Sequence, residues 1–113
     1  MSSESPPECR IVLCTCPEGD AAERLARTLV DEGLAACVNR LPGVTSTFRW
    51  QGRVEEERET LLLVKSTTAR LAELQERIKA LHPYELPEVI AVPVQDGLPA
   101  YLDWVIQSTE KSE

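Results

Sequence analysis

The chain has 113 residues, of which 42% are hydrophobic and 27% are charged, and its formal net charge is −7. This length and composition predict one globular domain that buries a core without needing disulfides, and they exclude a disordered chain. The 12 Lys and Arg residues are interleaved with acidic residues and form no basic patch, which argues against nucleic acid or an anionic membrane as a partner.

The ends of the chain predict short tails around a single domain. Residues 1–9 have no basic region and no apolar run, so they resemble a flexible tail rather than a signal peptide. The sequence contains no run of about 18 apolar residues, so no membrane span is predicted. We therefore expect a cytoplasmic protein whose four cysteines are thiols, with a domain over residues 10–108 and a frayed C-terminus over 109–113.

The first elements are a strand and a helix. Residues 10–16 form an apolar, β-branched run that Pro17 stops, which is typical of a buried strand. Asp20 stands at the N-cap position of the next segment, whose apolar residues recur at three-and-four spacing until Gly33. That spacing predicts a helix with one buried face.

A long hairpin follows. The segment 35–50 is apolar and β-branched and is interrupted by Pro42-Gly43, where we expect a bulge or a bend. Gln51-Gly52 separates it from a second strand-like run over residues 53–65, and a glycine in so short a gap is a hairpin signal. Both runs are longer than an average strand.

The second half of the chain predicts a helix, a short strand and a closing helix. Thr67 or Thr68 can cap the first helix, and Pro83 ends it. The buried face of that helix is predicted to consist of Leu71, Leu74, Ile78 and Leu81. Residues 89–92 form a short strand between prolines, and residues 100–106 form the C-terminal helix.

This order of elements is that of the α+β class, in the ferredoxin-like split βαβ arrangement with an added C-terminal helix. Two modest helices cannot cover so long a hairpin. An exposed strand edge invites pairing with another copy, so a homo-oligomer is expected.

His82 is the only histidine, so any Ser/His/Asp or Cys/His mechanism would depend on it. It lies at the predicted end of a helix, where it can satisfy the last carbonyls or act as a ligand, and the sequence leaves both roles open. No nucleophile has a visible base, so we expect a protein that binds rather than an enzyme.

The cysteines offer one candidate pair. Cys14 and Cys16 are two apart on a strand, so both side chains point to one face, where they either pack in the core or share a soft metal. Cys9 and Cys37 add no Cys-x-x-Cys spacing, so neither a tetrahedral zinc site nor a thioredoxin-type site is indicated.

A second group of polar residues could line a small cleft. Glu59 and Lys65 flank the apolar part of one strand, nominally on one face, and Trp50 is expected near them across the hairpin. Tyr84 lies between Pro83 and Pro87 in a segment that also carries Glu85 and Glu88. This segment is either a rigid binding loop or a stiff connection.

Several motifs together resemble the CutA family of divalent-cation tolerance proteins. They are Leu34-Ala35-Ala36-Cys37-Val38-Asn39, Phe48-Arg49-Trp50-Gln51-Gly52, Leu63-Val64-Lys65-Ser66-Thr67, His82-Pro83-Tyr84-Glu85-Leu86-Pro87-Glu88 and Tyr101-Leu102-Asp103-Trp104. The resemblance covers residues 11–106.

The resemblance implies a homotrimer that binds copper(II), and other divalent cations, in the response to metal ions. It implies Cys14 and His82 as metal ligands, while Leu81 stands where some copper-binding relatives have a second histidine. The alternative is a non-enzymatic trimer that binds a small ligand or signals, with Trp50, Glu59, Lys65 and Tyr84 in a cleft between subunits. Protein partners of other kinds are not indicated.

Overall fold

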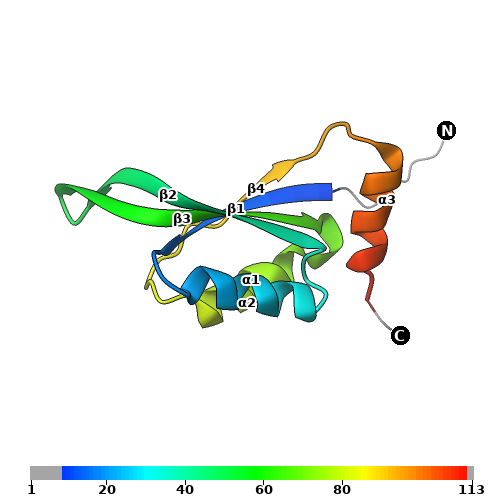
Figure 1. Ribbon diagram of the computed structural model, residues 1–113, viewed down its shortest axis with the longest axis horizontal. Coiled ribbons are helices and arrows are strands. Elements are labelled where there is room, and N and C mark those ends of the chain that lie inside the picture. The colour runs from blue at the N-terminus through cyan, green and yellow to red at the C-terminus, as the bar shows by residue number, and fades with distance from the viewer. Residues whose placement is uncertain (1–8, 112–113) are drawn as a thin grey trace.

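A computed structural model describes residues 9–111 as one antiparallel sheet with helices (Figure 1). The elements are β1 (Cys9–Pro17), α1 (Ala21–Asp31), β2 (Cys37–Trp50), β3 (Arg53–Thr67), a 3-10 turn (Thr68–Arg70), α2 (Leu71–Leu81), β4 (Ile90–Pro93) and α3 (Pro99–Ser108). The strand order is β2-β3-β1-β4. Helices α1 and α2 cover one face of the sheet, and α3 lies at the end away from the hairpin tip. The predicted α+β, ferredoxin-like architecture is confirmed.

Beyond the helices, β2 and β3 continue as a two-stranded arm (Figure 1). Trp50 pairs with Arg53 at its tip, and Gln51 and Gly52 have φ values of 50° and 80°, as a type I′ turn requires. The predicted irregularity at Pro42-Gly43 is confirmed as a register shift between Leu41 and Val44. The hairpin is therefore continuous but bent near its middle.

The core lies between the sheet and the two covering helices. Strand alternation turns Val12, Cys14 and Cys16 of β1 toward α1 and α2, beside their β3 partners Val64, Leu62 and Thr60. The helices contribute the buried residues Ala22, Leu25, Leu29, Leu74 and Ile78. Both cysteines of the predicted pair are therefore inside the domain.

The second helix differs from its prediction at both ends. A 3-10 turn follows β3, so α2 begins at Leu71 rather than at a threonine cap, and Thr67 makes no side-chain capping bond. Thr67 is instead buried, with its Oγ1 3.4 Å from Oγ1 of Thr109. Leu81 is 41% exposed, so the buried face of the helix ends at Ile78.

Two residues assigned to the tails belong to the domain. Cys9 begins β1 and is 7% exposed, and Thr109 is 1% exposed and donates a hydrogen bond of 2.9 Å to the carbonyl of Val105. Cys9 and Thr109 therefore belong to the folded domain rather than to the predicted tails. The rest of the predicted tails, residues 1–8 and 112–113, lies outside the described residues.

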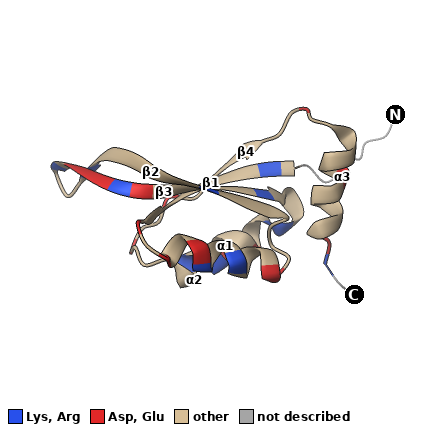
Figure 2. Cartoon of the chain, in the orientation of Figure 1, with Lys and Arg blue, Asp and Glu red and all other residues tan. Residues whose placement is uncertain are grey.

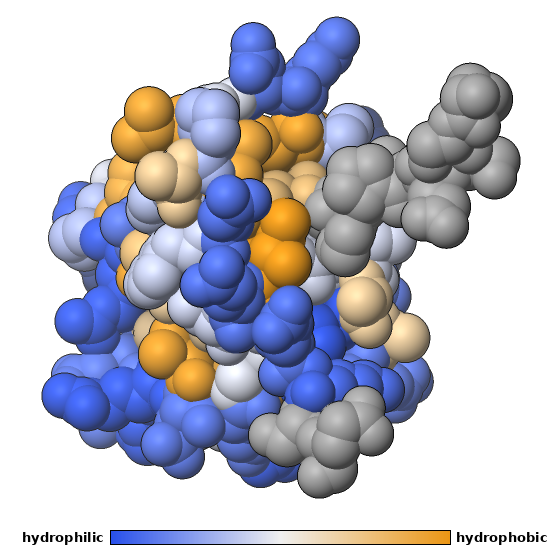
Figure 3. Space-filling view, turned by 90° about the vertical axis from the view of Figure 1, so that its right-hand side faces the viewer, coloured by the Kyte–Doolittle hydropathy of each residue, from blue (hydrophilic) through white to orange (hydrophobic). Residues whose placement is uncertain are grey.

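One side of the molecule is poor in charge. Figure 2 shows charged residues on α1, α2 and the arm, whereas β4 and α3 are almost uncharged. On the face that carries α3, Figure 3 shows several apolar groups between hydrophilic ones. Large apolar residues exposed here are Ile90, Val92, Leu98, Tyr101 and Trp104. Apolar surface of this kind is typical of a contact with another protein.

In the described part of the chain, no helix has the length and apolarity that crossing a membrane requires.

Candidate functional site

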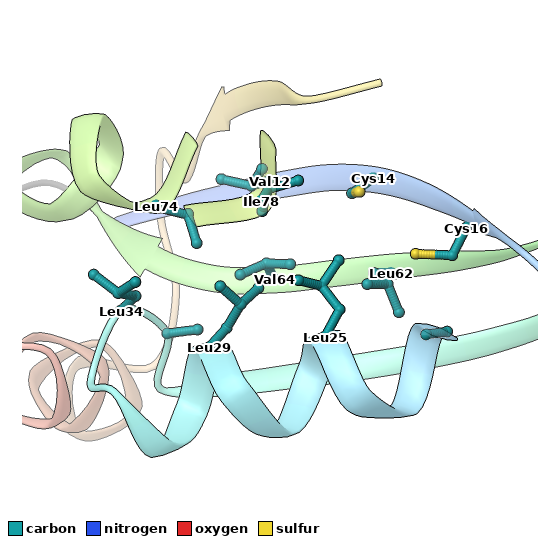
Figure 4. Close-up of a cluster of buried hydrophobic side chains, with 12 residues drawn as sticks. Val12, Cys14, Cys16, Leu25, Leu29, Leu34, Leu62, Val64, Leu74 and Ile78 are labelled. Carbon is teal, nitrogen blue, oxygen red and sulfur yellow. The ribbon is translucent and has the colours of Figure 1, made fainter. Parts of the chain in front are cut away.

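Three potential metal ligands converge inside the domain. One donor atom each from Cys14, Cys16 and His82 lies within 4.8 Å of the other two, and all three residues are buried. The cysteines come from the core-facing side of β1, which Figure 4 shows above α1. His82 follows α2 directly, and its extended backbone (φ −74°, ψ 139°) turns the chain away from the helix axis.

The ring of His82 is held by two hydrogen bonds. Its Nε2 lies 2.7 Å from the carbonyl oxygen of Thr15 on β1, and its Nδ1 lies 3.0 Å from the backbone nitrogen of Tyr84. Because a carbonyl only accepts and a backbone N–H only donates, Nε2 carries the proton and Nδ1 accepts. These two partners fix the neutral tautomer of the ring.

His82 was expected either to bond the last carbonyls of the helix or to act as a ligand. Its backbone bonds to the helix, but its side chain does not. Its backbone N–H bonds to the carbonyl of Ile78 and closes the last turn of α2. Its side chain bonds across to β1 instead of to the helix carbonyls. The residue therefore ties the segment after α2 to the first strand.

The two thiols interact directly. A hydrogen bond with Cys16, together with burial, raises the pKa of Cys14. The same hydrogen bond lowers the pKa of Cys16. The ionisation of each thiol therefore depends on the other.

A second polar pair adjoins the first site. Tyr84 donates a hydrogen bond of 2.8 Å to Oε2 of Glu59, whose residue is only 4% exposed, and its ring centroid is 4.8 Å from that of His82. Burial, followed by the bond to Glu59, raises the pKa of the Tyr84 phenol. Tyr84 thus makes two contacts. Its backbone N–H donates to His82, and its phenol donates to the buried carboxyl group of Glu59 on β3.

Within one chain, the four cleft candidates do not form one group. Glu59 and Tyr84 touch, but Trp50 pairs with Arg53 at the tip of the arm, while Glu59 pairs with Val44 and Pro17. The expectation that Trp50 lies near Glu59 is therefore wrong. In the pairing of β2 with β3, Trp50 is at the tip of the arm, whereas Glu59 lies beside the bulge.

Lys65 is engaged elsewhere. Its Nζ donates to Oδ1 of Asn39 and lies 3.9 Å from Sγ of Cys37. Two surface hollows, of about 640 and 390 Å³, are lined chiefly by residues of α1 and α2, and their walls contain none of the site residues. The Cys14, Cys16 and His82 group is therefore the strongest candidate site in the described part of the chain.

The sequence predicted two members of this group, Cys14 and His82, and the structure brings them together. It adds Cys16, which the two-residue spacing on a strand had already placed on the same face as Cys14. Glu85 and Glu88, the additional carboxylates of the 82–88 segment, are exposed.

Comparison with known proteins gives consistent results. Residues 10–108 match the model of the CutA1 divalent ion tolerance protein family. A divalent-cation tolerance protein CutA of Thermus thermophilus is 52% identical over 99 residues, which are 88% of this chain and 96% of that protein. The mouse protein CutA is 46% identical over 96 residues, which are 85% of this chain and 54% of that protein.

Solved structures agree with these matches. The structure of CutA from Xylella fastidiosa has a TM-score of 0.89 at 46% identity and covers 91% of this chain and 99% of its own. A PII-like protein CutA from Nostoc has a TM-score of 0.83 at 41% identity, with coverages of 89% and 97%.

Proposed function

Because the chain belongs to the CutA1 divalent ion tolerance protein family, we propose that it binds copper(II) through Cys14 and His82 in the tolerance of divalent metal ions. The observation that carries the proposal is the convergence of these two buried side chains, from β1 and from the end of α2, to within 4.8 Å. Thiolate and imidazole are ligands that copper prefers to oxygen donors. The proposed role is binding without turnover.

The hydrogen bond at Nε2 of His82 is compatible with metal binding through Nδ1. Ligating histidines commonly donate their other ring N–H to a carbonyl, which fixes the ring for the metal. The bond from Nε2 to Thr15 is of this kind and leaves Nδ1 as the donor atom. A metal at Nδ1 would replace the hydrogen bond from the Tyr84 N–H, so binding requires a small movement of the chain at Tyr84.

Calorimetric titration with copper(II) tests the proposal. We expect Cys14→Ala and His82→Ala each to weaken binding by at least about tenfold, because each removes a ligand. Cys37→Ala makes the same chemical change as Cys14→Ala, but on β2, and should bind as the wild type does. Unchanged affinity in both site variants would exclude these residues as ligands.

We also propose that the protein is a homotrimer. The two edge strands, β2 and β4, each have one unpaired side in the chain described, and the surface around β4 and α3 is apolar. Pairing one edge with the other edge of a neighbouring copy is a heterologous contact, and such a contact forms a ring when the rotation between copies closes. Light scattering should give three times the chain mass of 12.6 kDa, and a stable monomer at micromolar concentration would contradict the proposal.

Two further predictions stay predictions. Within one chain only Glu59 and Tyr84 of the four cleft candidates touch, and the small-ligand alternative places its cleft between subunits. The cytoplasmic location stays a prediction, since the names of relatives place one in the chloroplast and another in the periplasm.

A further inference from the structure

The proposed copper site uses Cys14 and His82 and assigns no role to Cys16, the third residue of the group. The donor atom of Cys16 is within 4.8 Å of those of both Cys14 and His82. Cys16 is fully buried, on the same side of β1 as Cys14. The question is whether it is a ligand or only part of the core.

The spacing allows one ion to reach all three atoms. With thiolate–metal bonds of about 2.3 Å, as for zinc, two sulfurs on one ion can be up to about 4.6 Å apart. The observed limit of 4.8 Å exceeds this only slightly. The two sulfurs are therefore close enough for one ion to bind both with only a small shift of the side chains.

The surroundings restrict which ion would bind. Hard cations such as Mg²⁺ and Ca²⁺ require oxygen ligands, and the nearby carboxyl group of Glu59 already accepts the bond from Tyr84. Zinc takes four ligands, and the described residues bring three His, Cys, Asp or Glu donors together here, so zinc would need a water as its fourth ligand among buried side chains. Two thiolates and one imidazole form a soft donor set, and soft thiolate ligands select monovalent copper.

We propose that Cys16 is a third ligand at this site and that the complete Cys14, Cys16 and His82 set holds monovalent copper, Cu(I). The proposal deepens the proposed function, since it rests on the same Cys14 and His82 ligands and adds one residue and one oxidation state. Both thiols bind as thiolates, and their protons pass to the solvent. No electron transfer is involved, because the ion is supplied as Cu(I).

The test is an anaerobic titration of the reduced protein with Cu(I) in competition with the chromogenic chelator bicinchoninate. Cys16→Ala should weaken Cu(I) binding by at least tenfold, and should weaken it more than it weakens copper(II) binding. Cys37→Ala is the matched control and should bind both ions as the wild type does. Equal Cu(I) affinity in wild type and Cys16→Ala would overturn the proposal.

Two outcomes separate this inference from the proposed function. If copper(II) binding depends on Cys14 and His82 while Cu(I) binding does not respond to Cys16→Ala, only the inference fails. If neither ion binds the wild type, both fail. X-ray absorption of the wild type loaded with Cu(I) gives a second measurement that needs no variant. Two sulfur ligands and one nitrogen ligand are expected, and a single sulfur would contradict the third ligand.

Discussion

Leu62→Ala should lower the free energy of unfolding by about 2–5 kcal/mol, the usual cost of emptying a fully buried leucine site. Leu62 is 0% exposed and pairs directly with Cys14 across β1 and β3. Its neighbours in Figure 4 are held by the sheet on one side and α1 on the other, so they cannot collapse into the space. Denaturant unfolding at a fixed protein concentration measures the loss, since an oligomer's stability depends on concentration.

The matched control is Leu81→Ala, the same chemical change at the end of α2. Leu81 is 41% exposed, so less apolar surface returns to water and no closed cavity forms. Its loss of stability should be less than half that of Leu62→Ala. Equal losses would mean that the layer between the sheet and α1 is not the main source of stability.

Leu62→Ala is also expected to weaken metal binding at the Cys14, Cys16 and His82 group. A cavity beside Cys14 gives the thiol room to change rotamer, and a ligand that is less well fixed binds its metal more weakly. Copper affinity should therefore fall in Leu62→Ala, although no ligand is removed, and should stay unchanged in Leu81→Ala.

Local patterns predicted the part of this structure that depends on strand and helix periodicity. Alternation placed Cys14 and Cys16 on one face of a strand, and Gln51-Gly52 and Pro42-Gly43 marked the turn and the bulge at their observed places. These features follow from neighbouring residues and backbone sterics, which the sequence states directly.

Features that depend on distant contacts could not be predicted in this way. Thr67 packs against Thr109, 42 residues later, so a residue suited to capping a helix is buried instead. His82 bonds to Thr15, 67 residues earlier, which no local pattern encodes. Trp50 and Glu59 were expected to be close, but the register of the long hairpin separates them.

His82→Ala should destabilise the protein by about 2–4 kcal/mol, even with no metal present. The ring satisfies the buried carbonyl of Thr15 and the partly buried N–H of Tyr84, and a buried group left without a partner costs about 1–3 kcal/mol, less where water reaches it. The bonds also fix the segment after α2 against β1. We therefore expect faster hydrogen exchange at the Tyr84 amide, together with the loss of stability measured by denaturant.

Tyr84→Phe is the control for this prediction. It removes the phenol bond to Glu59 but keeps the backbone N–H that donates to His82. Exchange at residue 84 should then remain slow, although stability falls by about 1–3 kcal/mol because the buried carboxyl group of Glu59 loses its partner. Wild-type exchange in His82→Ala would show that the ring does not hold this segment.

Comparing two variants separates the roles of His82 that the sequence left open. Cys14→Ala removes a proposed ligand but none of the His82 hydrogen bonds, so we expect it to lose copper affinity while exchange at the Tyr84 amide stays slow. His82→Ala should lose both. If His82→Ala loses stability but keeps its copper affinity, the histidine is structural only, and the metal must be held by the two thiols of β1.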